Sequence, residues 1–268
     1  MSTLLQLESV RAQLASRHFG PFDLSVAAGQ RIAILGPSGA GKSTLLKLMA
    51  GERLPHAGTV HVDGIALAAH GPVAMALRRA VLPQSHTVAF GMPVELVVAL
   101  GRIAREPDRG QAAIITQALQ AAQAAHLAGR RFDTLSGGEQ ARVQLARVFA
   151  QLWDARGGLL LVDEPLSALD PGLQFELMDA MQHYSRERGH ALVAVLHDIN
   201  QALAGFDRLW LIGAGQLQAD MAPGVQAVAA LEQLYGIGLR CAEAADGTLA
   251  VLPMRRTSVR PTLASEAA

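Results

Sequence analysis

The chain has 268 residues, of which 50% are apolar and 17% are charged, and its 23 basic side chains balance 23 acidic ones. This length allows one large domain or two small ones with a buried core, and the apolar content excludes wholesale disorder. The even charge balance excludes a generally cationic surface for nucleic acid, whereas the size leaves room for an enzyme.

Short apolar runs rich in β-branched residues alternate with longer Ala/Leu/Gln segments along most of the chain. This pattern is typical of an α/β fold, in which strands of a parallel sheet are buried between helices. The clearest strands are predicted at residues 31–35, 158–162, 191–196 and 208–212. Three of them run directly into polar residues. Because ligands of open α/β sheets bind at the carboxyl ends of strands, we expect these three ends to share one crevice.

A glycine-rich segment follows the first of these strands and matches G-x-x-x-x-G-K-[ST], with a helix predicted over residues 45–50. The glycines let successive backbone N–H groups point inward, and the helix start adds the positive end of its dipole, so the segment predicts a phosphate cradle. Lys42 would supply a charge for the β- and γ-phosphates, and the Ser43 hydroxyl would ligate Mg²⁺. The predicted cradle consists of Gly36, Pro37, Ser38, Gly39, Ala40, Gly41, Lys42, Ser43 and Thr44.

Between about residues 83 and 152 strand-like runs give way to helical patterns, for instance over 111–126 and 139–152, which predicts a helical insertion. Ser136 and Glu139 have the spacing of a capping box at the start of the second helix, so a plain helix cap is one interpretation. Between them stand Gly137 and Gly138, and two glycines cost a helix interior roughly 1 kcal/mol each relative to alanine, somewhat less at an end. A plain cap gains nothing from them, whereas a phosphate approaching bare N–H groups would.

Two adjacent acids, Asp163 and Glu164, end the strand predicted at residues 158–162. Burying two carboxylates so close together is costly unless a cation or hydrogen-bond donors compensate. Beside the phosphate cradle the pair therefore predicts a metal: Asp163 would hold Mg²⁺ through water, and Glu164 would polarise an attacking water. Without the cradle, an exposed turn at the strand end would be a strong alternative.

The region beyond residue 212 contains mixed short elements, and residues 255–268 have no clear period, so we expect a frayed tail. The single cysteine, Cys241, cannot form a disulfide within the chain, which favours a reducing compartment, and we expect its thiol to be buried. The first residues do not resemble a signal peptide, and the most apolar runs are strand-length. We therefore expect a cytosolic protein without a membrane span.

Taken together these motifs resemble those of ABC ATPases. Residues 135–140 are similar to that family's signature motif, and the other family motifs occur in their usual order at the phosphate cradle, Gln84, residues 163–164, residues 167–170 and His197. The resemblance covers about residues 4 to 212. It implies a P-loop NTPase (RecA-like) core sheet, from residues 1–83 and 153–212, with an inserted helical subdomain at 84–152 and a C-terminal segment at 213–268, all within one ABC ATPase domain.

The resemblance also implies roles for single residues. Gln84 resembles the glutamine that touches Mg²⁺ and begins the helical subdomain, and His197 resembles the switch histidine that contacts the γ-phosphate. Asp170 resembles the acid that shapes the dimer interface, although a helix-capping role before Pro171 stays open. The predicted catalytic set is then Lys42, Gln84, Glu164 and His197, and the predicted metal set is Ser43, Gln84 and Asp163.

In this family two subunits face each other head to tail, and Ser136, Gly137, Gly138 and Glu139 of one subunit cover the ATP bound in the other. The resemblance therefore predicts a homodimer that binds ATP and Mg²⁺. One departure concerns adenine, which the family commonly stacks on an aromatic side chain. The corresponding residues 12–15 contain none. His18 or Phe19 could cover the base, and we expect Phe22 in the core.

As a function, the resemblance implies ATP hydrolysis that drives transport through two separate integral membrane permease subunits. A non-transport ABC ATPase acting on nucleic acid is the alternative, and three features oppose it: the short gap between Gln84 and Ser136, the single phosphate cradle and the single cysteine. A kinase or G-protein-like switch is disfavoured by residues 135–140. We therefore expect no nucleic-acid partner.

Residues 81–84 and 94–102 are similar to the ATPase subunits of bacterial importers for haem, iron-siderophores and vitamin B12. Residues 142–153 and 194–200 look closest to the hemin-import branch, so haem is the first cargo expected, with siderophore and cobalamin as alternatives. The chain would then lie peripherally on the cytoplasmic face of the bacterial inner membrane, with a periplasmic substrate-binding protein as an indirect partner. No residue of this chain is expected to touch the cargo.

Overall fold

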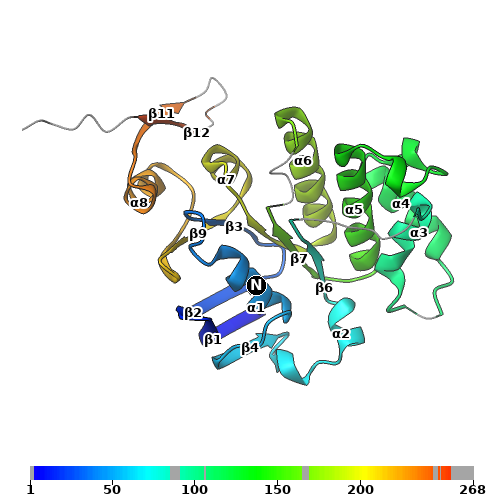
Figure 1. Cartoon of the computed structure of the whole chain (residues 1–268), viewed down its shortest axis with the longest axis horizontal. Coiled ribbons are helices and arrows are strands. Elements are labelled where there is room, and N and C mark those ends of the chain that lie inside the picture. The colour runs from blue at the N-terminus through cyan, green and yellow to red at the C-terminus, as the bar shows by residue number, and fades with distance from the viewer. Residues whose placement is uncertain are drawn as a thin grey trace, which may run out of the picture.

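The computed structural model describes residues 3–84, 91–105, 107–164, 169–243, 247 and 249–254. Within these residues a six-stranded sheet runs through the middle of the molecule in the order β10-β9-β3-β8-β7-β6 (Figure 1). Strands β9, β3, β8, β7 and β6 are parallel, and β10 pairs antiparallel to β9 at one edge. The strands are β3 (Arg31–Leu35), β6 (Arg79–Leu82), β7 (Leu159–Asp163), β8 (Ala191–Val195), β9 (Arg208–Gly213) and β10 (Gln216–Met221).

Both faces of this sheet are buried, which explains why its strands read as continuous apolar runs. Leu192 and Ala194 of β8 pack into one apolar cluster, whereas Val193 and Val195 pack into another. The helices around the sheet are α1 (Lys42–Ala50), α6 (Pro171–Arg188), α7 (Ile199–Gly205) and α8 (Val225–Tyr235). The four predicted strands lie within one residue of their expected bounds, and the predicted α/β class is confirmed.

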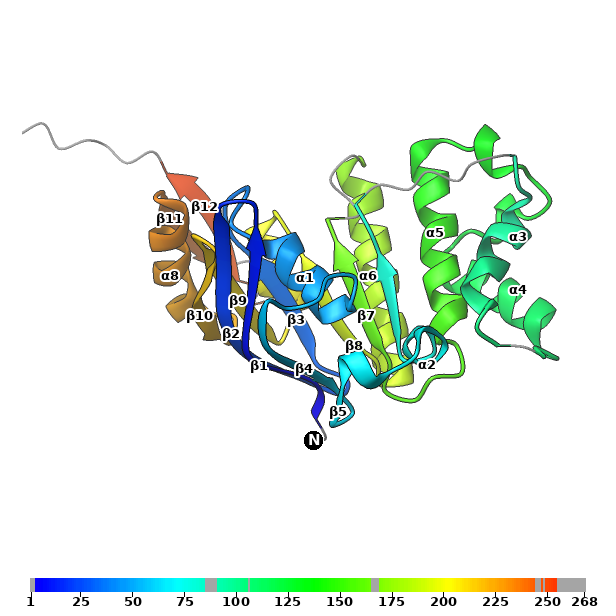
Figure 2. The same ribbon diagram turned by 60° about the horizontal axis from the view of Figure 1, so that its bottom comes forward.

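A second, antiparallel sheet has the order β2-β1-β4-β5 and was not predicted from the sequence. Its side chains share one apolar cluster with α1 and β3, so this sheet supports the segment between β3 and α1 (Figure 2). Its strands are β1 (Thr3–Leu14), β2 (Arg17–Ala27), β4 (Ala57–Val62) and β5 (Ile65–Ala66), and the chain then passes through η1 (Leu67–Ala69) and α2 (Pro72–Ala76) to β6.

The described residues between Gly91 and Leu152 form helices that gather at the opposite end of the molecule from α8 (Figures 1 and 2). The helix expected over residues 111–126 ends early, because Gln123 adopts a left-handed backbone with φ 55° that interrupts the helical hydrogen bonds. The elements are α3 (Val94–Ala99), η2 (Leu100–Arg102), α4 (Gln111–Ala121), η3 (Ala125–Leu127), η4 (Phe132–Thr134) and α5 (Gly137–Leu152).

Helix α5 is attached to the sheet-covering helix α6 near its C-terminal end. The ring of Phe149 stacks on Tyr184 with centroids 4.0 Å apart, and the Tyr184 hydroxyl donates a hydrogen bond to the backbone oxygen of Phe149 at 2.7 Å. Arg188 adds a bond from its guanidinium to the backbone oxygen of Trp153 at 2.7 Å. Arg142, in the first half of α5, also pairs with Glu176 of α6, so the two helices are joined along the length of α5.

The chain beyond β10 contains α8 and a two-stranded hairpin of β11 (Gly238–Glu243) and β12 (Leu249–Met254). The expectation that Cys241 is buried is wrong: it lies exposed on β11. A two-stranded hairpin buries little of its own surface, and Cys241 faces outward from it. The tail expected to fray, residues 255–268, lies outside the described residues. In the described part of the chain, no helix combines the length and apolar character needed to cross a bilayer.

Candidate nucleotide site

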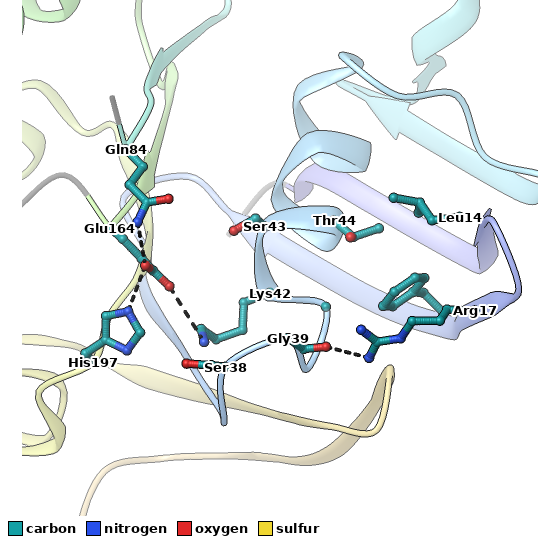
Figure 3. A pocket seen from close by; sticks show the side chains of 12 residues that line it. Leu14, Arg17, Ser38, Gly39, Lys42, Ser43, Thr44, Gln84, Glu164 and His197 are labelled. Atoms are coloured by element: carbon teal, nitrogen blue, oxygen red, sulfur yellow. Dashed lines mark hydrogen bonds and ion pairs between the residues drawn. The ribbon is translucent and has the colours of Figure 1, made fainter. Parts of the chain in front are cut away.

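A cavity of about 410 Å³ opens at the carboxyl ends of the parallel strands (Figure 3). The predicted phosphate cradle follows β3, Glu164 follows β7 and His197 follows β8, so the three strand ends expected to share one crevice do so. Gln84, which follows β6, lines the same cavity. The β1–β2 hairpin supplies its far wall. The lining residues are Leu14, Arg17, Phe19, Ser38, Gly39, Gly41, Lys42, Ser43, Thr44, Gln84, Glu164 and His197.

The segment between β3 and α1 can curl because glycines stand where side chains would clash. A Cβ at Gly36 would collide with the carbonyl oxygen of Ile212, and a Cβ at Gly41 would collide with the ring of Phe19. Gly41, the residue before α1, has a left-handed backbone with φ 105°, and no described side chain caps the helix start. The first N–H groups of α1 therefore remain for an external acceptor, which is the arrangement that binds phosphate.

Lys42 is the charged group of this cradle, and its side chain is only 4% exposed. Its ammonium donates hydrogen bonds to the backbone oxygens of Gly36 at 2.9 Å and Pro37 at 3.2 Å. The backbone N–H of Ala40 also bonds to the oxygen of Pro37, at 3.1 Å, which closes the turn. The loop thus folds back on its own lysine and presents a buried positive charge beside the cavity.

Glu164 lies at the meeting point of three side chains in the cavity (Figure 3). Its carboxylate accepts a hydrogen bond from the Gln84 amide at 3.1 Å, lies 2.7 Å from Nε2 of His197 and lies 3.7 Å from the Lys42 ammonium. Its backbone has a positive φ of 45°, which is uncommon for a residue with a side chain and costs energy that surrounding contacts must offset. The fold therefore holds this carboxylate at the cavity in spite of local strain.

Asp163, one residue earlier, points to the start of α1 instead. Its carboxylate accepts a hydrogen bond from the Ser43 hydroxyl at 2.8 Å. Burial raises the pKa of Asp163 above its usual range, the nearby charge of Glu164 raises it further, and the Ser43 hydrogen bond acts in the opposite direction. A hydroxyl and a carboxylate in contact are hard oxygen donors of the kind that Mg²⁺ prefers, so these residues fit that ion.

The end of the cavity nearest the β1–β2 hairpin contains Arg17, which was not predicted from the sequence. Its guanidinium donates to the backbone oxygen of Gly39 at 2.6 Å and lies 5.3 Å from the ring centroid of Phe19. Phe19 is buried against Gly41, and Phe22 is fully buried in the core, as expected. His18, proposed to cover a base, is not among the residues that line the cavity. No local sequence pattern marks Arg17, because its place at the cavity depends on the pairing of Leu14 with Arg17 in the β1–β2 hairpin.

The second glycine pair does not reach this cavity within one chain. Ser136 caps α5 in a complete capping box: its hydroxyl accepts from the backbone N–H of Glu139 at 3.3 Å, and the Glu139 carboxylate accepts from the backbone N–H of Ser136 at 2.8 Å. A Cβ at Gly137 would meet no described atom within 4 Å, so nothing in the described part of the chain requires glycine there. Gly138 is tighter, since a Cβ there would touch the side chain of Leu173.

Asp170 also acts as a helix cap, because its carboxylate accepts from the backbone N–H of Leu173 at 3.0 Å at the start of α6. It does not line the cavity, and the preceding residues 165–168, which include Ser167 and Ala168 of the predicted interface motif, lie outside the described residues. Within the described chain, the predicted site residues thus separate into a group at the cavity and a group, Ser136–Glu139 and Asp170, away from it.

Comparison with known proteins places these motifs in a family. The family model described as ABC transporter matches residues 19–167. Hemin import ATP-binding proteins HmuV are similar along most of the chain. That of Rhodopseudomonas palustris is 44% identical over 205 residues, 75% of each chain, and that of Nocardia farcinica is 44% identical over 248 residues, 90% of this chain and 84% of the other. That of Pseudomonas aeruginosa is 46% identical over 196 residues, 72% of this chain and 76% of the other.

Solved structures share the fold at lower sequence identity. A metal-chelate type ABC transporter in an inward-facing conformation matches with a TM-score of 0.78 and 24% identity, over 96% of this chain and 99% of the other. An ATP-binding cassette solved as a dimer in a post-hydrolysis state with ADP and Pi matches with a TM-score of 0.72 and 22% identity, over 82% of this chain and 99% of the other. The predicted ABC ATPase type of fold is therefore confirmed.

Proposed function

The chain belongs to the ABC transporter family, and on that premise we propose that it is the ATP-hydrolysing subunit of a bacterial importer that takes up hemin. The observation that carries this proposal is the convergence of Lys42, Ser43 and Glu164 on one cavity, in a chain up to 46% identical to proteins named for hemin import. The family accounts for ATP hydrolysis, and the relatives' names supply the cargo.

The residues at the cavity have distinct roles in this proposal. The triphosphate of ATP lies along the glycine cradle, where the N–H groups at the start of α1 and the Lys42 ammonium offset its charge. Glu164 accepts the proton of the attacking water, and His197, whose Nε2 lies 2.7 Å from this carboxylate, orients the carboxylate and the γ-phosphate. Ser43 and Asp163, with Gln84 nearby, would hold Mg²⁺, which when bound neutralises phosphate charge.

A second copy of the chain completes the site. Ser136, Gly137 and Gly138 do not line the cavity of their own chain, and no described atom would meet a Cβ at Gly137, which leaves room for a phosphate from another chain. Two copies arranged head to tail would bring this helix start to the nucleotide of the partner, so that ATP lies between two sets of N–H groups. Hydrolysis then removes contacts that held the copies together, which converts chemical energy into movement.

An apolar surface on the helical part of the chain is where we place the permease. Leu96, Leu100 and Ile103 are 48%, 41% and 72% exposed, and they border a groove of about 340 Å³ whose other walls include Arg102 and Asp108. Large apolar side chains exposed together in this way are typical of a protein interface. Two integral membrane subunits docked here would hold the ATPase at the cytoplasmic face of the inner membrane, with a periplasmic binding protein as an indirect partner.

The test is reconstitution of the full chain with its permease in liposomes, followed by ATP hydrolysis and hemin uptake. Glu164→Gln should retain ATP binding and lose hydrolysis by about 100-fold or more, because it removes the general base and keeps the shape. Glu187→Gln, the same change on the exposed face of α6, should hydrolyse ATP like the wild type. Wild-type hydrolysis by Glu164→Gln would contradict the role of Glu164. Uptake of a ferric siderophore or cobalamin instead of hemin would contradict the cargo.

A further inference from the structure

The segment that follows β10 has no role in the function proposed above. We call α8, β11 and β12 (Val225–Tyr235, Gly238–Glu243 and Leu249–Met254) the C-terminal brace. It packs against the end of the central sheet, and it makes polar contacts with two elements that lead into the nucleotide cavity (Figure 1). The inference below rests on the proposed function, since it concerns the same cavity.

The first contact joins the brace to the phosphate cradle. The hydroxyl oxygen of Tyr235, the last residue of α8, accepts a hydrogen bond from the backbone N–H of Gly36 at 3.0 Å. Gly36 is buried, and its own carbonyl oxygen accepts the bond from the Lys42 ammonium at 2.9 Å. One glycine therefore connects the Tyr235 hydroxyl with the cationic group of the cavity. Burial raises the pKa of Tyr235, so its hydroxyl remains protonated across the physiological range.

The second contact joins the brace to the helix that follows His197. Asn200, in the first turn of α7, donates from its amide to the backbone oxygen of Val251 at 3.2 Å and accepts from the backbone N–H of Val251 at 2.7 Å. Val251 is itself only 3% exposed and belongs to the main apolar cluster. Because both polar atoms of the amide are used, the start of α7 is fixed in position and orientation relative to β12.

The two contacts belong to one connected unit. The carboxylate of Glu232 in α8 accepts from the backbone N–H of Leu239 at 2.6 Å, which ties the helix to β11. Strand β11 then pairs with β12 so that Cys241 lies opposite Val251. A path of hydrogen bonds thus runs from Gly36 through Tyr235, α8 and the hairpin to Asn200.

We propose that the C-terminal brace sets the distance between the phosphate cradle and the switch histidine, with Tyr235 acting through Gly36 on Lys42, and Asn200 acting through α7 on His197. Tyr235 and Asn200 are positioning residues, since neither lines the cavity. Lys42 contacts bound phosphate, whereas His197 acts during hydrolysis. The two residues should therefore affect different kinetic parameters.

The test uses the two tyrosines of the chain as a matched pair. Tyr235→Phe and Tyr184→Phe each remove one hydroxyl that bonds to the backbone, at Gly36 and Phe149 respectively. Both variants should lose a similar amount of thermal stability. Tyr235→Phe alone should raise the KM for ATP about fivefold, the size expected from one lost hydrogen bond. An unchanged KM in Tyr235→Phe, or an equal rise in both variants, would overturn the proposal.

Asn200 provides a second measurement in the full chain. Asn200→Ala should lower kcat about fivefold and leave the KM for ATP within about twofold of the wild type. Asn200→Asp keeps the oxygen that accepts from Val251 and should recover part of the loss. A wild-type kcat in Asn200→Ala would overturn the proposal while the proposed ATPase function stands. A wild-type chain that neither binds nor hydrolyses ATP would overturn the proposed function itself.

Discussion

Asp163 is a buried carboxylate whose raised pKa opposes folding at neutral pH. A carboxyl group with a higher pKa in the folded state than in the unfolded state destabilises the fold above both pKa values. This effect is absent below the unfolded pKa. Asp163→Asn removes the charge and keeps an oxygen that accepts from Ser43. We expect it to raise the Tm of the nucleotide-free chain by about 2–4 °C at pH 7 and to abolish Mg²⁺-dependent hydrolysis.

Thermal unfolding of the wild type and Asp163→Asn between pH 7 and pH 4 measures this effect. The difference in Tm should shrink as the pH falls, because the wild-type carboxyl then becomes protonated. Asp179→Asn is the control, because it makes the same chemical change at an exposed position of α6. If Asp163→Asn unfolds at a lower temperature than the wild type at pH 7, this result contradicts the electrostatic argument.

At the scale of single residues, the sequence was sufficient to predict the functional side chains that belong to a local motif. Lys42 and Ser43 belong to the glycine-rich motif after β3, and Asp163 and Glu164 stand at the end of β7. The structure places these residues at one cavity or in contact with it. Their roles in binding and catalysis remain predictions. Tyr235 could not be found in this way, because its contact with Gly36 joins residues that are 199 positions apart.

At the scale of elements, Arg102 determines how the helical part is held together. Its side chain is 2% exposed and bonds to Asp108 through two nitrogens, at 2.7 and 2.8 Å, and to Asp154 at 2.6 Å. These bonds join η2 to the start of α4 and the end of α5. A lysine ammonium cannot bond to both aspartates with the planar geometry of a guanidinium. Arg102→Lys should therefore lower the free energy of unfolding by about 2 kcal/mol or more.

Urea unfolding checks this prediction. Arg131→Lys provides the matched control, because its bond to Asp133 lies between side chains that are 63% and 45% exposed. An exposed ion pair contributes little, so this control should change stability by less than about 1 kcal/mol. Equal effects from the two variants would mean that the Arg102 cluster does not stabilise the helical part.

The elements that were predicted correctly are those buried on both sides. Strands β3, β7, β8 and β9 read as continuous apolar runs because helices and the second sheet cover them. Strand β1 was missed because its buried and exposed residues alternate irregularly, with shifts in its pairing to β2. Its assignment depends on packing against α1, which a local pattern does not contain.

For the whole molecule, the main prediction is dimerisation that depends on ATP. Glu164→Gln with MgATP should convert from monomer to dimer in light scattering, because ATP is bound but not hydrolysed. Adding Ser136→Arg should return the chain to monomer, since a large cation would occupy the surface at Gly137. Adding Thr116→Arg, on the exposed face of α4, should leave the dimer intact. A Glu164→Gln chain that remains monomeric with MgATP would contradict the facing arrangement.

The anchoring of α5 has a mechanical consequence. The helix has 16 residues and is therefore about 24 Å long, and it is held against α6 along this length, by Phe149 and Trp153 near one end and by the pair of Arg142 with Glu176 in its first half. Gly137 is exposed just beyond these contacts. Helices α5 and α6 therefore form a rigid couple, and a rotation of the couple by about 10° against the central sheet would carry Gly137 through about 4 Å, which is enough to make or break a hydrogen bond.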